Sequence, residues 1–184
     1  MPILVTSPAL DLQLFNMDAE DRKTGTCMTG NLKSLLQHKI VQAANTGRLC
    51  REEMTQWSLS LDRLLSSKYG MKIFQAFLKS EFSDENLEFW SVCEDFKKIS
   101  CPLKMSFKAK KIFKVYIRTE APREINIDHK TRELVRSNMK ALSTVCFDDA
   151  QKIVYRLMEK DSYPRFLRSN VYRTLLDSTR PSMT

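Results

Sequence analysis

The sequence predicts an all-α protein, with about seven to nine short helices in its main domain. From Met54 onward, apolar residues recur at helical spacing almost without a break, and no stretch alternates with period two for long enough to compete as a strand. The chain has 184 residues and four glycines, and none follows Gly70. Glycine-dependent hairpin turns and phosphate-binding glycine loops are therefore excluded from the larger part of the chain.

Residues 1–53 are predicted to form a separate, variable segment. One apolar stripe indicates a short amphipathic helix in a segment that is otherwise partly disordered; it consists of Leu32, Leu35, Leu36, Ile40 and Ala43. This helix could bind a membrane surface or a partner, pack on the main domain or stay mobile. We assign residues 54–178 to the helical domain and residues 179–184 to a C-terminal tail.

Three helices are expected in the first part of the domain. The first ends at Tyr69 and Gly70, and its apolar face consists of Trp57, Leu61, Leu64 and Leu65. The second carries Met71, Phe74, Phe77 and Leu78. Ser83 is expected to cap the third helix, with Asp84 and Glu85 in its first turn, where carboxylates favour the positive end of the helix dipole. The buried face of this third helix consists of Leu87, Trp90, Cys93 and Phe96.

Prolines and polar caps divide the rest of the domain. A helix is expected to start after Pro102 and to run to about Thr119, and Asp128 is placed to cap the next one. That helix carries Leu134, Val135, Met139 and Leu142, and its successor carries Phe147, Ala150, Ile153, Val154 and Leu157. Residues 160–164 are expected to interrupt the pattern. Two short helical pieces then carry Phe166, Leu167, Tyr172, Leu175 and Leu176.

Charge is unevenly distributed along the chain, whose formal net charge is +8. Residues 81–95 carry acidic side chains and no base, whereas residues 97–118 carry basic side chains and no acid. One interpretation is two solvated helix faces. The other is a basic patch that binds an anionic surface.

The residues offer little material for an enzyme. Glu85 and Glu88 could act as an acid–base pair, but capping of an acid-rich helix start explains them more simply. His38 lies in the N-terminal segment and His129 follows the expected cap, so neither stands near a visible nucleophile. We expect no catalytic residue, no cofactor and no metal site.

The five cysteines are far apart in sequence and form no CxxC pair, which indicates a reducing compartment. Cys93 falls on the apolar face of its helix, where a buried core thiol is expected. The first ten residues lack a basic flank and a long apolar run, so we expect neither a secretory signal nor a membrane span.

Irregular polar segments occur at three helix junctions, residues 81–86, 124–128 and 160–165. Recognition residues commonly lie in such junctions on a rigid scaffold. Asn126 is unusual, because this amide is flanked by Ile125 and Ile127 in a stretch without regular pattern. It could form a local turn bond to the backbone or contact a partner.

The same junctions carry a family resemblance. The segments FLKSEFSDENLEFW (77–90), CEDFKK (93–98), APREINID (121–128) and LMEKDSYPRFL (157–167) closely resemble the regulator of G-protein signalling (RGS) domain, in the family's order and spacing. The resemblance runs from about Trp57 to Leu176. The chain looks like a small, essentially single-domain member.

The resemblance implies a fold of about nine helices, in which a four-helix bundle forms one lobe and the helices near the termini form the other. It also implies the function of accelerating GTP hydrolysis by α subunits of heterotrimeric G proteins, which terminates receptor signalling. Such a domain is not itself an enzyme, because it contributes no catalytic group. It holds the switch regions of the α subunit in their transition-state shape.

By the same resemblance, the α subunit is contacted by Ser83, Glu85, Asn86, Asn126, Leu157, Asp161, Ser162 and Arg165. Asn126 would reach toward the catalytic Gln of the α subunit. Asp161 would accept backbone N–H groups, and Arg165 would hold Asp161 in place. Asn126 suits α subunits of the inhibitory and q classes, in the GTP or transition-state form.

The alternative function is that of a helical adaptor that binds anionic lipid through the basic run. The candidate lipid-binding residues are Lys97, Lys98, Lys108 and Lys111. Family members bind acidic phospholipid and calmodulin near this region, so both are further candidate partners. Nucleic acid is not expected, because the run has few interleaved aromatics and no known reader motif. The expected location is cytoplasmic, with peripheral association at the inner face of the plasma membrane.

Overall fold

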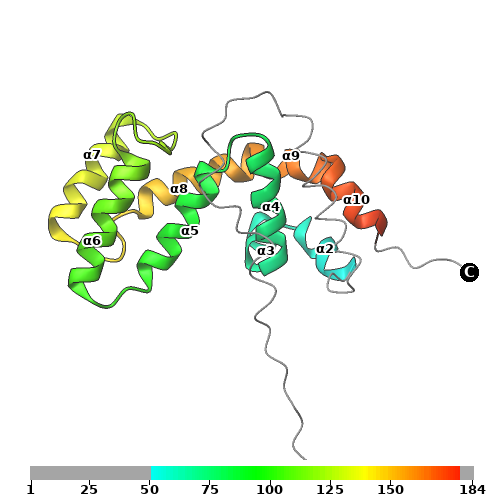
Figure 1. The fold of residues 1–184 in the computed structure, drawn as a ribbon, viewed down its shortest axis with the longest axis horizontal. Helices are drawn as coiled ribbons and strands as arrows, with labels where there is room; N and C mark the ends of the chain where they lie inside the picture. Colours follow the sequence, from blue (N-terminus) through cyan, green and yellow to red (C-terminus); the bar gives the residue numbers. More distant parts are fainter. Residues whose placement is uncertain (1–50, 179–184) are drawn as a thin grey trace, which may run out of the picture.

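The structure is a computed structural model that describes residues 51–178, and this range is entirely helical, as the sequence predicts (Figure 1). Its nine α-helices are α2 (Arg51–Trp57), α3 (Leu61–Ser66), α4 (Lys68–Ser80), α5 (Glu85–Lys97), α6 (Pro102–Ile112), α7 (His129–Asn138), α8 (Asp148–Leu157), α9 (Tyr163–Arg168) and α10 (Asn170–Ser178). Two π-helical turns, η3 (Phe113–Ile117) and η5 (Met158–Ser162), extend α6 and α8, and a 3-10 turn, η4 (Met139–Ala141), extends α7. The expected amphipathic stripe, His38 and the C-terminal tail lie outside the described residues.

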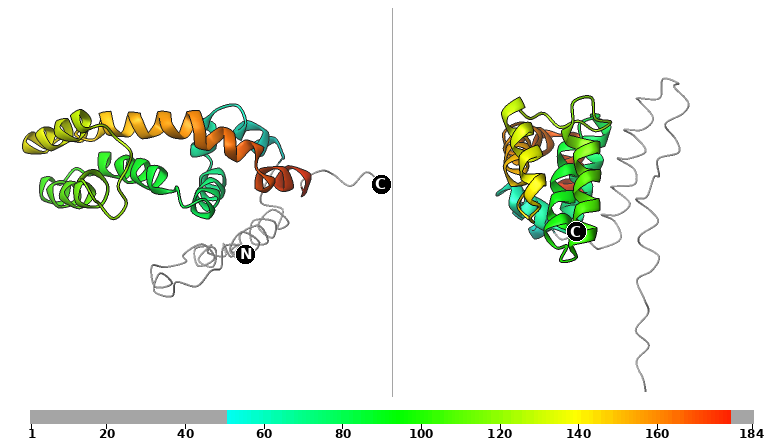
Figure 2. Two further views of the ribbon diagram at one scale, coloured as in Figure 1. Left: turned by 90° about the horizontal axis from the view of Figure 1, so that it is seen from above. Right: turned by 90° about the vertical axis from the view of Figure 1, so that its left-hand side faces the viewer.

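The helices form two lobes, which confirms the expected four-helix bundle and terminal lobe (Figure 1). Helices α5, α6, α7 and α8 make the bundle, and α2, α3, α4, α9 and α10 make the terminal lobe. Each lobe has its own hydrophobic core. Helix α8 continues through η5 into α9, so one helical rod joins the lobes (Figure 2).

Aromatic rings fill the core of the bundle. Phe96 and Phe147 meet edge to face with ring centroids 5.2 Å apart, and Phe89 lies beside Phe147. Cys93 is 1% exposed, and its burial raises the pKa of the thiol well above the ordinary value of 9.0. The expectation of a buried core cysteine is confirmed.

Two buried tyrosine hydroxyls hold the ends of the domain together in the terminal lobe. Tyr163 donates a hydrogen bond to the backbone oxygen of Trp57 at 2.8 Å, and Tyr172 donates one to that of Met54 at 2.8 Å. Both acceptors belong to α2, while the donors lie on α9 and α10. Helix α2 is therefore fastened to the last two helices of the domain.

Gly70 does not end a helix, contrary to the sequence prediction. It lies in the first turn of α4, whose N-cap Ser67 accepts a hydrogen bond from the Gly70 N–H at 2.9 Å. A Cβ atom on Gly70 would lie 2.7 Å from the backbone oxygen of Leu64 and 3.0 Å from the ring of Trp57. Glycine is required here because helices approach each other closely.

The expected interruption at residues 160–164 is also wrong, because the helix continues through this segment. In η5 the N–H of Tyr163 donates to the carbonyl of Met158, five residues back. Pro164 has no N–H and its ring would crowd the carbonyl four residues earlier in a regular α-helix. The wider π turn changes that spacing and allows the rod to pass the proline.

The cap predictions are partly confirmed. Asp128 caps α7, because its Oδ1 accepts from the N–H of Thr131 at 2.9 Å. Ser83 is not the cap of α5, which starts one residue later than expected, at Glu85. The N-cap position is Asp84, whose carboxylate makes no capping bond because it pairs with a distant arginine.

One expected core residue of α7 lies on the surface. Leu134 is 43% exposed, whereas its neighbour Val135 faces the core.

Every helix within residues 51–178 is too short or too polar to cross a lipid bilayer.

Candidate functional site

Three helix junctions lie together where the two lobes meet. They are residues 81–86 between α4 and α5, residues 121–128 between η3 and α7, and residues 157–165 along the rod from α8 to α9. We call these three segments the junction surface. Two arginines, Arg165 and Arg123, tie them to one another.

Arg165 joins the rod to the segment between α4 and α5. Its Nη2 donates to Asp161 Oδ2 at 2.8 Å, and its Nη1 is paired with Glu81 at the end of α4. The hydrogen bond from Arg165 lowers the pKa of Asp161. The exposed carboxylate of Asp161 is therefore ionised at neutral pH and presents its oxygens as acceptors.

Arg123 joins the segment before α7 to the start of α5. Its Nη2 forms an ion pair with Asp84 Oδ1 at 2.7 Å, and its Nε donates to Glu88 Oε2 at 3.0 Å. Burial raises the pKa of Glu88, and the charge of Arg123 opposes that effect. The backbone N–H of Arg123 also donates to Val115 in η3 at 3.0 Å. One guanidinium thus holds two carboxylates of α5 beside this loop.

Asn126 is presented outward between two anchored neighbours. Ile125 and Ile127 are buried, at 1% and 7% exposure, and the N–H of Ile125 donates to the backbone oxygen of Tyr116 at 3.0 Å. The Asn126 side chain is exposed and makes no hydrogen bond to any residue within 51–178. The local turn bond considered from sequence is not formed in this range.

Two polar atoms at the start of α5 lack partners. Ser83 Oγ and Asn86 Oδ1 are buried, yet neither has a hydrogen-bond partner in the described part of the chain. Such atoms are uncommon in folded proteins, because an unpaired buried polar group costs free energy. Their clustering in one junction is expected where another molecule completes the hydrogen bonds. Glu85 lies between them, partly exposed in the first turn of α5.

The rod contributes the remaining candidate residues at different depths. Leu157 is half-buried at the end of α8, one turn before Asp161. Ser162 is only 7% exposed, so its side chain lies within the domain. The structure therefore brings the three segments together but leaves Ser162 little surface of its own.

Four residues at this surface are not among the contact residues predicted from the sequence: Glu81, Phe82, Asp84 and Arg123. Phe82 is 76% exposed, and its φ of 54° is in the left-handed region that a phenylalanine rarely adopts. Its sequence signal is a large apolar residue set among polar ones, outside the apolar stripe of α4. Asp84 and Arg123 had no sequence signal as a pair, because only the fold brings them into contact.

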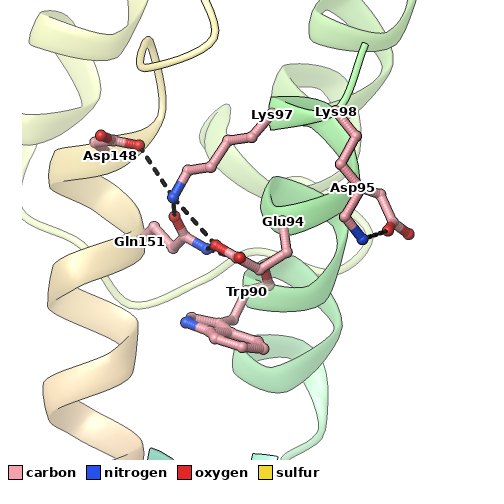
Figure 3. Close-up of polar contacts among 7 residues, drawn as sticks. All are labelled: Trp90, Glu94, Asp95, Lys97, Lys98, Asp148 and Gln151. Carbon is pink, nitrogen blue, oxygen red and sulfur yellow. Dashed lines mark hydrogen bonds and ion pairs between the residues drawn. The ribbon is translucent and has the colours of Figure 1, made fainter. Parts of the chain in front are cut away.

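Two of the candidate lipid-binding lysines are engaged in ion pairs (Figure 3). Lys97 lies 3.1 Å from Glu94 and 3.4 Å from Asp148, and its Nζ donates to Gln151 Oε1 at 2.7 Å. Lys98 pairs with Asp95 at 3.0 Å. The other two candidates lie on α6, where Lys108 is half-buried and Lys111 is exposed.

Gln151 is the centre of this network and ties α8 to α5 (Figure 3). Its Nε2 donates to the backbone oxygen of Trp90 at 3.1 Å and to Glu94 Oε1 at 2.8 Å. An open groove of about 350 Å³ runs beside it and is lined by four acidic and three basic side chains among others. Because these charges nearly cancel, the groove offers no strong attraction to an ion.

The junction surface is suited to recognition. It presents a carboxylate, an amide and an exposed aromatic ring on rigid helix ends, with salt bridges that hold their spacing. Such a surface can accept backbone N–H groups of another chain and fix that chain in one conformation.

Comparisons with known proteins agree with the family resemblance found in the sequence. The protein-family model described as "Regulator of G protein signaling domain" matches residues 60–175 of the chain. "Regulator of G-protein signaling 8" of Mus musculus is 56% identical over 133 residues, which cover 72% of this chain and 74% of the relative. The Homo sapiens protein of the same name is 55% identical over 133 residues, with the same coverage. "Regulator of G-protein signaling 5" of Rattus norvegicus is 56% identical over 126 residues, which cover 68% of this chain and 70% of the relative.

Proposed function

Because the chain belongs to the family that carries the regulator of G-protein signalling domain, we propose that it accelerates GTP hydrolysis by α subunits of heterotrimeric G proteins. It acts as an activator and contributes no catalytic group. Faster hydrolysis returns the α subunit to its GDP form and terminates signalling from G-protein-coupled receptors.

The physical requirement for such an activator is modest. A Gα subunit already carries its transition-state-stabilising Arg in cis, so a helper protein need not insert one. It must bind the hydrolysing conformation more tightly than the ground state, because equal binding of both accelerates nothing. A hundredfold acceleration corresponds to about 2.7 kcal/mol, which a few well-placed hydrogen bonds can supply.

The observation that carries the proposal is the preorganised junction surface. Arg123 pairs with Asp84 and Glu88 at the start of α5, and Arg165 pairs with Glu81 at the end of α4 and with Asp161 on its own rod. The three segments therefore keep a fixed spacing before a partner binds. A surface that is rigid in advance loses less conformational entropy on binding. It also favours only one shape of the flexible switch segments.

Each candidate residue has a role in this proposal. Ser83, Glu85 and Asn86 meet the switch segments from the start of α5, and Asn126 reaches toward the catalytic Gln of the α subunit. Asp161 accepts backbone N–H groups, and Arg165 orients it through their 2.8 Å hydrogen bond. Leu157 and Ser162 complete the floor of the contact.

The proposed partners are α subunits of the inhibitory and q classes, in the GTP or transition-state form. Acidic phospholipid and calmodulin are further proposed partners, with peripheral association at the inner face of the plasma membrane. Within this proposal, the protein meets an α subunit that is itself at the membrane.

A pulldown with purified α subunits of the inhibitory and q classes, each in turn, tests the function. The immobilised full-length chain is offered the subunit bound to GDP, or to GDP with aluminium fluoride, which mimics the transferring phosphoryl group. Selective capture of the fluoride form is the expected result. Equal capture of both forms, or capture of neither by any inhibitory or q-class subunit, contradicts the proposal.

A second candidate function is a helical adaptor on anionic membranes, favoured by the basic side chains of α6. In that case anionic vesicles bind the chain, binding weakens as salt screens the charges, and single-turnover GTP hydrolysis is unchanged. An increase in the hydrolysis rate excludes an adaptor role alone.

A further inference from the structure

Ser106 lies in α6 between lysines that have no counter-ion. Lys104 precedes Ser106 by two residues and Lys108 follows it by two, while Lys110 and Lys111 continue the positive charge toward the end of the helix. None of these four ammonium groups has an ion-pair partner within residues 51–178, and α6 itself contains no acid. A hydroxyl side chain is thus surrounded along the sequence by unpaired positive charge.

The hydroxyl group of Ser106 is available for reaction. Its side chain is partly exposed, and its Oγ has no hydrogen-bond partner in the part of the chain that the structure describes. Other serines use theirs: Ser60 and Ser67 cap helices, and Ser80 donates to the backbone oxygen of Phe77. A modification of the Ser106 hydroxyl would therefore break no side-chain hydrogen bond of the described domain.

The first half of α6 is weakly held in place. Cys101, at the N-cap, makes no capping bond, and the first turn carries Lys104 and no acid at the positive end of the helix dipole. The buried residues of this helix begin only at Ala109. Residues 102–108 form no side-chain hydrogen bond or ion pair with any other described residue. Local opening of these residues therefore exposes little apolar surface, mainly that of Met105, and costs far less free energy than global unfolding.

We propose that Ser106 is a phosphorylation site for a serine/threonine kinase with an acidic substrate groove, and that the kinase reaches it when the start of α6 opens. Lysines on both sides of an acceptor complement the charge of such a groove. Phe107, which directly follows the acceptor and is 75% exposed, suits an apolar pocket beside the kinase active site. Kinases bind the acceptor segment in an extended form, so the helix must open first. This inference goes beyond the proposed activity and does not depend on it.

The transfer step requires ATP and the kinase. The Oγ of Ser106 attacks the γ-phosphorus of ATP, the bond from that phosphorus to the bridging oxygen breaks, and ADP leaves. The hydroxyl proton passes to the catalytic aspartate of the kinase. The phosphoserine adds a charge of about −1.5 to −2 at neutral pH. When the helix closes again, Lys110 lies four residues further along the same face, where its ammonium group can pair with the phosphate.

Ser100 also follows two lysines, but the structure distinguishes it from Ser106. Ser100 is exposed just before α6, with Lys97 and Lys98 three and two residues ahead of it. Figure 3 shows both lysines engaged with acidic partners on α5 and α8. A kinase groove must break these ion pairs to bind the lysines before Ser100, whereas the lysines around Ser106 have none. Ser106 is therefore the preferred acceptor.

Phosphorylation of the full chain in vitro tests the proposal. The chain is incubated with magnesium ATP and the catalytic domain of a protein kinase C, which selects basic residues on both sides of its acceptor. Mass spectrometry of the phosphopeptides then measures the initial rate at residue 106. We expect phosphate at Ser106 in the native chain and in Ser100→Ala, and none at this position in Ser106→Ala. Casein kinase 2, which selects acidic neighbours, should leave Ser106 unmodified.

A lysine double variant tests the charge pattern. Lys104→Gln/Lys108→Gln should lower the rate at Ser106 at least about tenfold, because two charge contacts with the kinase are lost. The matched control is Lys130→Gln/Lys140→Gln, which removes the same charge from exposed lysines elsewhere in the bundle. This control should keep the native rate.

Two variants at Cys101 test the opening step. Cys101→Asn supplies a capping side chain at the start of α6 and should slow phosphorylation at Ser106 about fivefold, because a cap stabilises the closed helix by a similar factor. Cys101→Ala cannot cap and should keep the native rate. In the native chain, the amide hydrogens of residues 105–108 should exchange faster than those of residues 90–96 in α5.

Four outcomes contradict the proposal. Protein kinase C adds no phosphate at Ser106, it modifies Ser100 in preference to Ser106, the Lys104→Gln/Lys108→Gln variant reacts as fast as the native chain, or Cys101→Asn leaves the rate unchanged. Circular dichroism of each variant confirms that it is folded, so that a lower rate is not the result of misfolding.

Discussion

Arg123 Nη2 lies 2.7 Å from Asp84 Oδ1, and this ion pair joins the loop that carries Asn126 to the start of α5. Asp84 is 4% exposed, so the pair is largely shielded from water. Charges that are shielded in this way interact more strongly than charges in water. The spacing between two segments of the junction surface thus depends on one guanidinium group.

Replacing Arg123 with methionine should destabilise the domain by roughly 3 kcal/mol, because Asp84 then remains buried without its counter-ion. Urea unfolding measures this change. Arg136→Met is the control, since its pair with Glu133 is exposed and such pairs contribute less than about 1 kcal/mol. Equal stability of the two variants would show that the Arg123 pair does not hold the loop.

The variant Asn126→Ala should weaken GTPase acceleration roughly tenfold or more, because it removes hydrogen bonds made to the partner. The side chain is exposed and has no bond within the described residues, so Tm should not change. Single-turnover hydrolysis by a purified α subunit checks the rate, with Asn170→Ala as an exposed control. An unchanged rate contradicts the role proposed for Asn126.

The variant Leu157→Asp should nearly abolish the activity by placing a charge in an apolar contact. Leu157 is half-buried, so circular dichroism must show that the variant is folded. Leu59→Asp, at a leucine 64% exposed in the terminal lobe, should keep the native rate in the same assay. If both variants behave alike, Leu157 is not part of the contact.

The variant Gly70→Ala should destabilise the domain by about 1–3 kcal/mol, as overpacking of a tight contact does. Helix propensity alone predicts the opposite sign, a gain of about 1 kcal/mol for alanine inside a helix. The added Cβ would lie 2.7 Å from the backbone oxygen of Leu64, so the packing effect should dominate. Thermal unfolding decides between the two signs, with Lys79→Ala as an exposed control in α4.

The cap of α7 should weaken in acid. The N–H and hydroxyl of Thr131 lower the pKa of Asp128 below its ordinary value of 3.8. A group whose pKa is lowered by folding stabilises the fold at pH values above its ordinary pKa. This stability is lost as the pH falls through the pKa of the group in the folded state. The variant Asp128→Asn can cap the helix without titrating. Below pH 3.8, the Tm of the native chain should therefore fall relative to the Tm of this variant. A constant Tm difference across this range would contradict the assignment.

Local patterns predicted much of the fold correctly. Leu87, Cys93 and Phe96 are buried as predicted, although Trp90 of the same predicted face is only partly buried. The helix predicted to follow Pro102 begins at that proline, and Asp128 caps α7. These predictions all depend on residues within a few positions of one another. The motifs at the junctions identified the family and the candidate contact residues. Their contacts with an α subunit remain proposals.

The prediction was wrong where residues far apart in the sequence determine the local structure. Gly70 marks a close helix approach, and the segment at 160–164 continues as a π turn. Neither outcome can be read from helical spacing, because each depends on what packs against the segment.

By itself, the sequence determined the all-α class, the faces of most helices and the family, since periodicity and motifs are local properties of the chain. Only the tertiary structure decided which charges are paired and which are free. Lys97 is held by Glu94 and Asp148, while Lys104, Lys110 and Lys111 of α6 have no ion-pair partner within the described range. Coulomb energy depends on distance and burial, and both are set by which helices pack together.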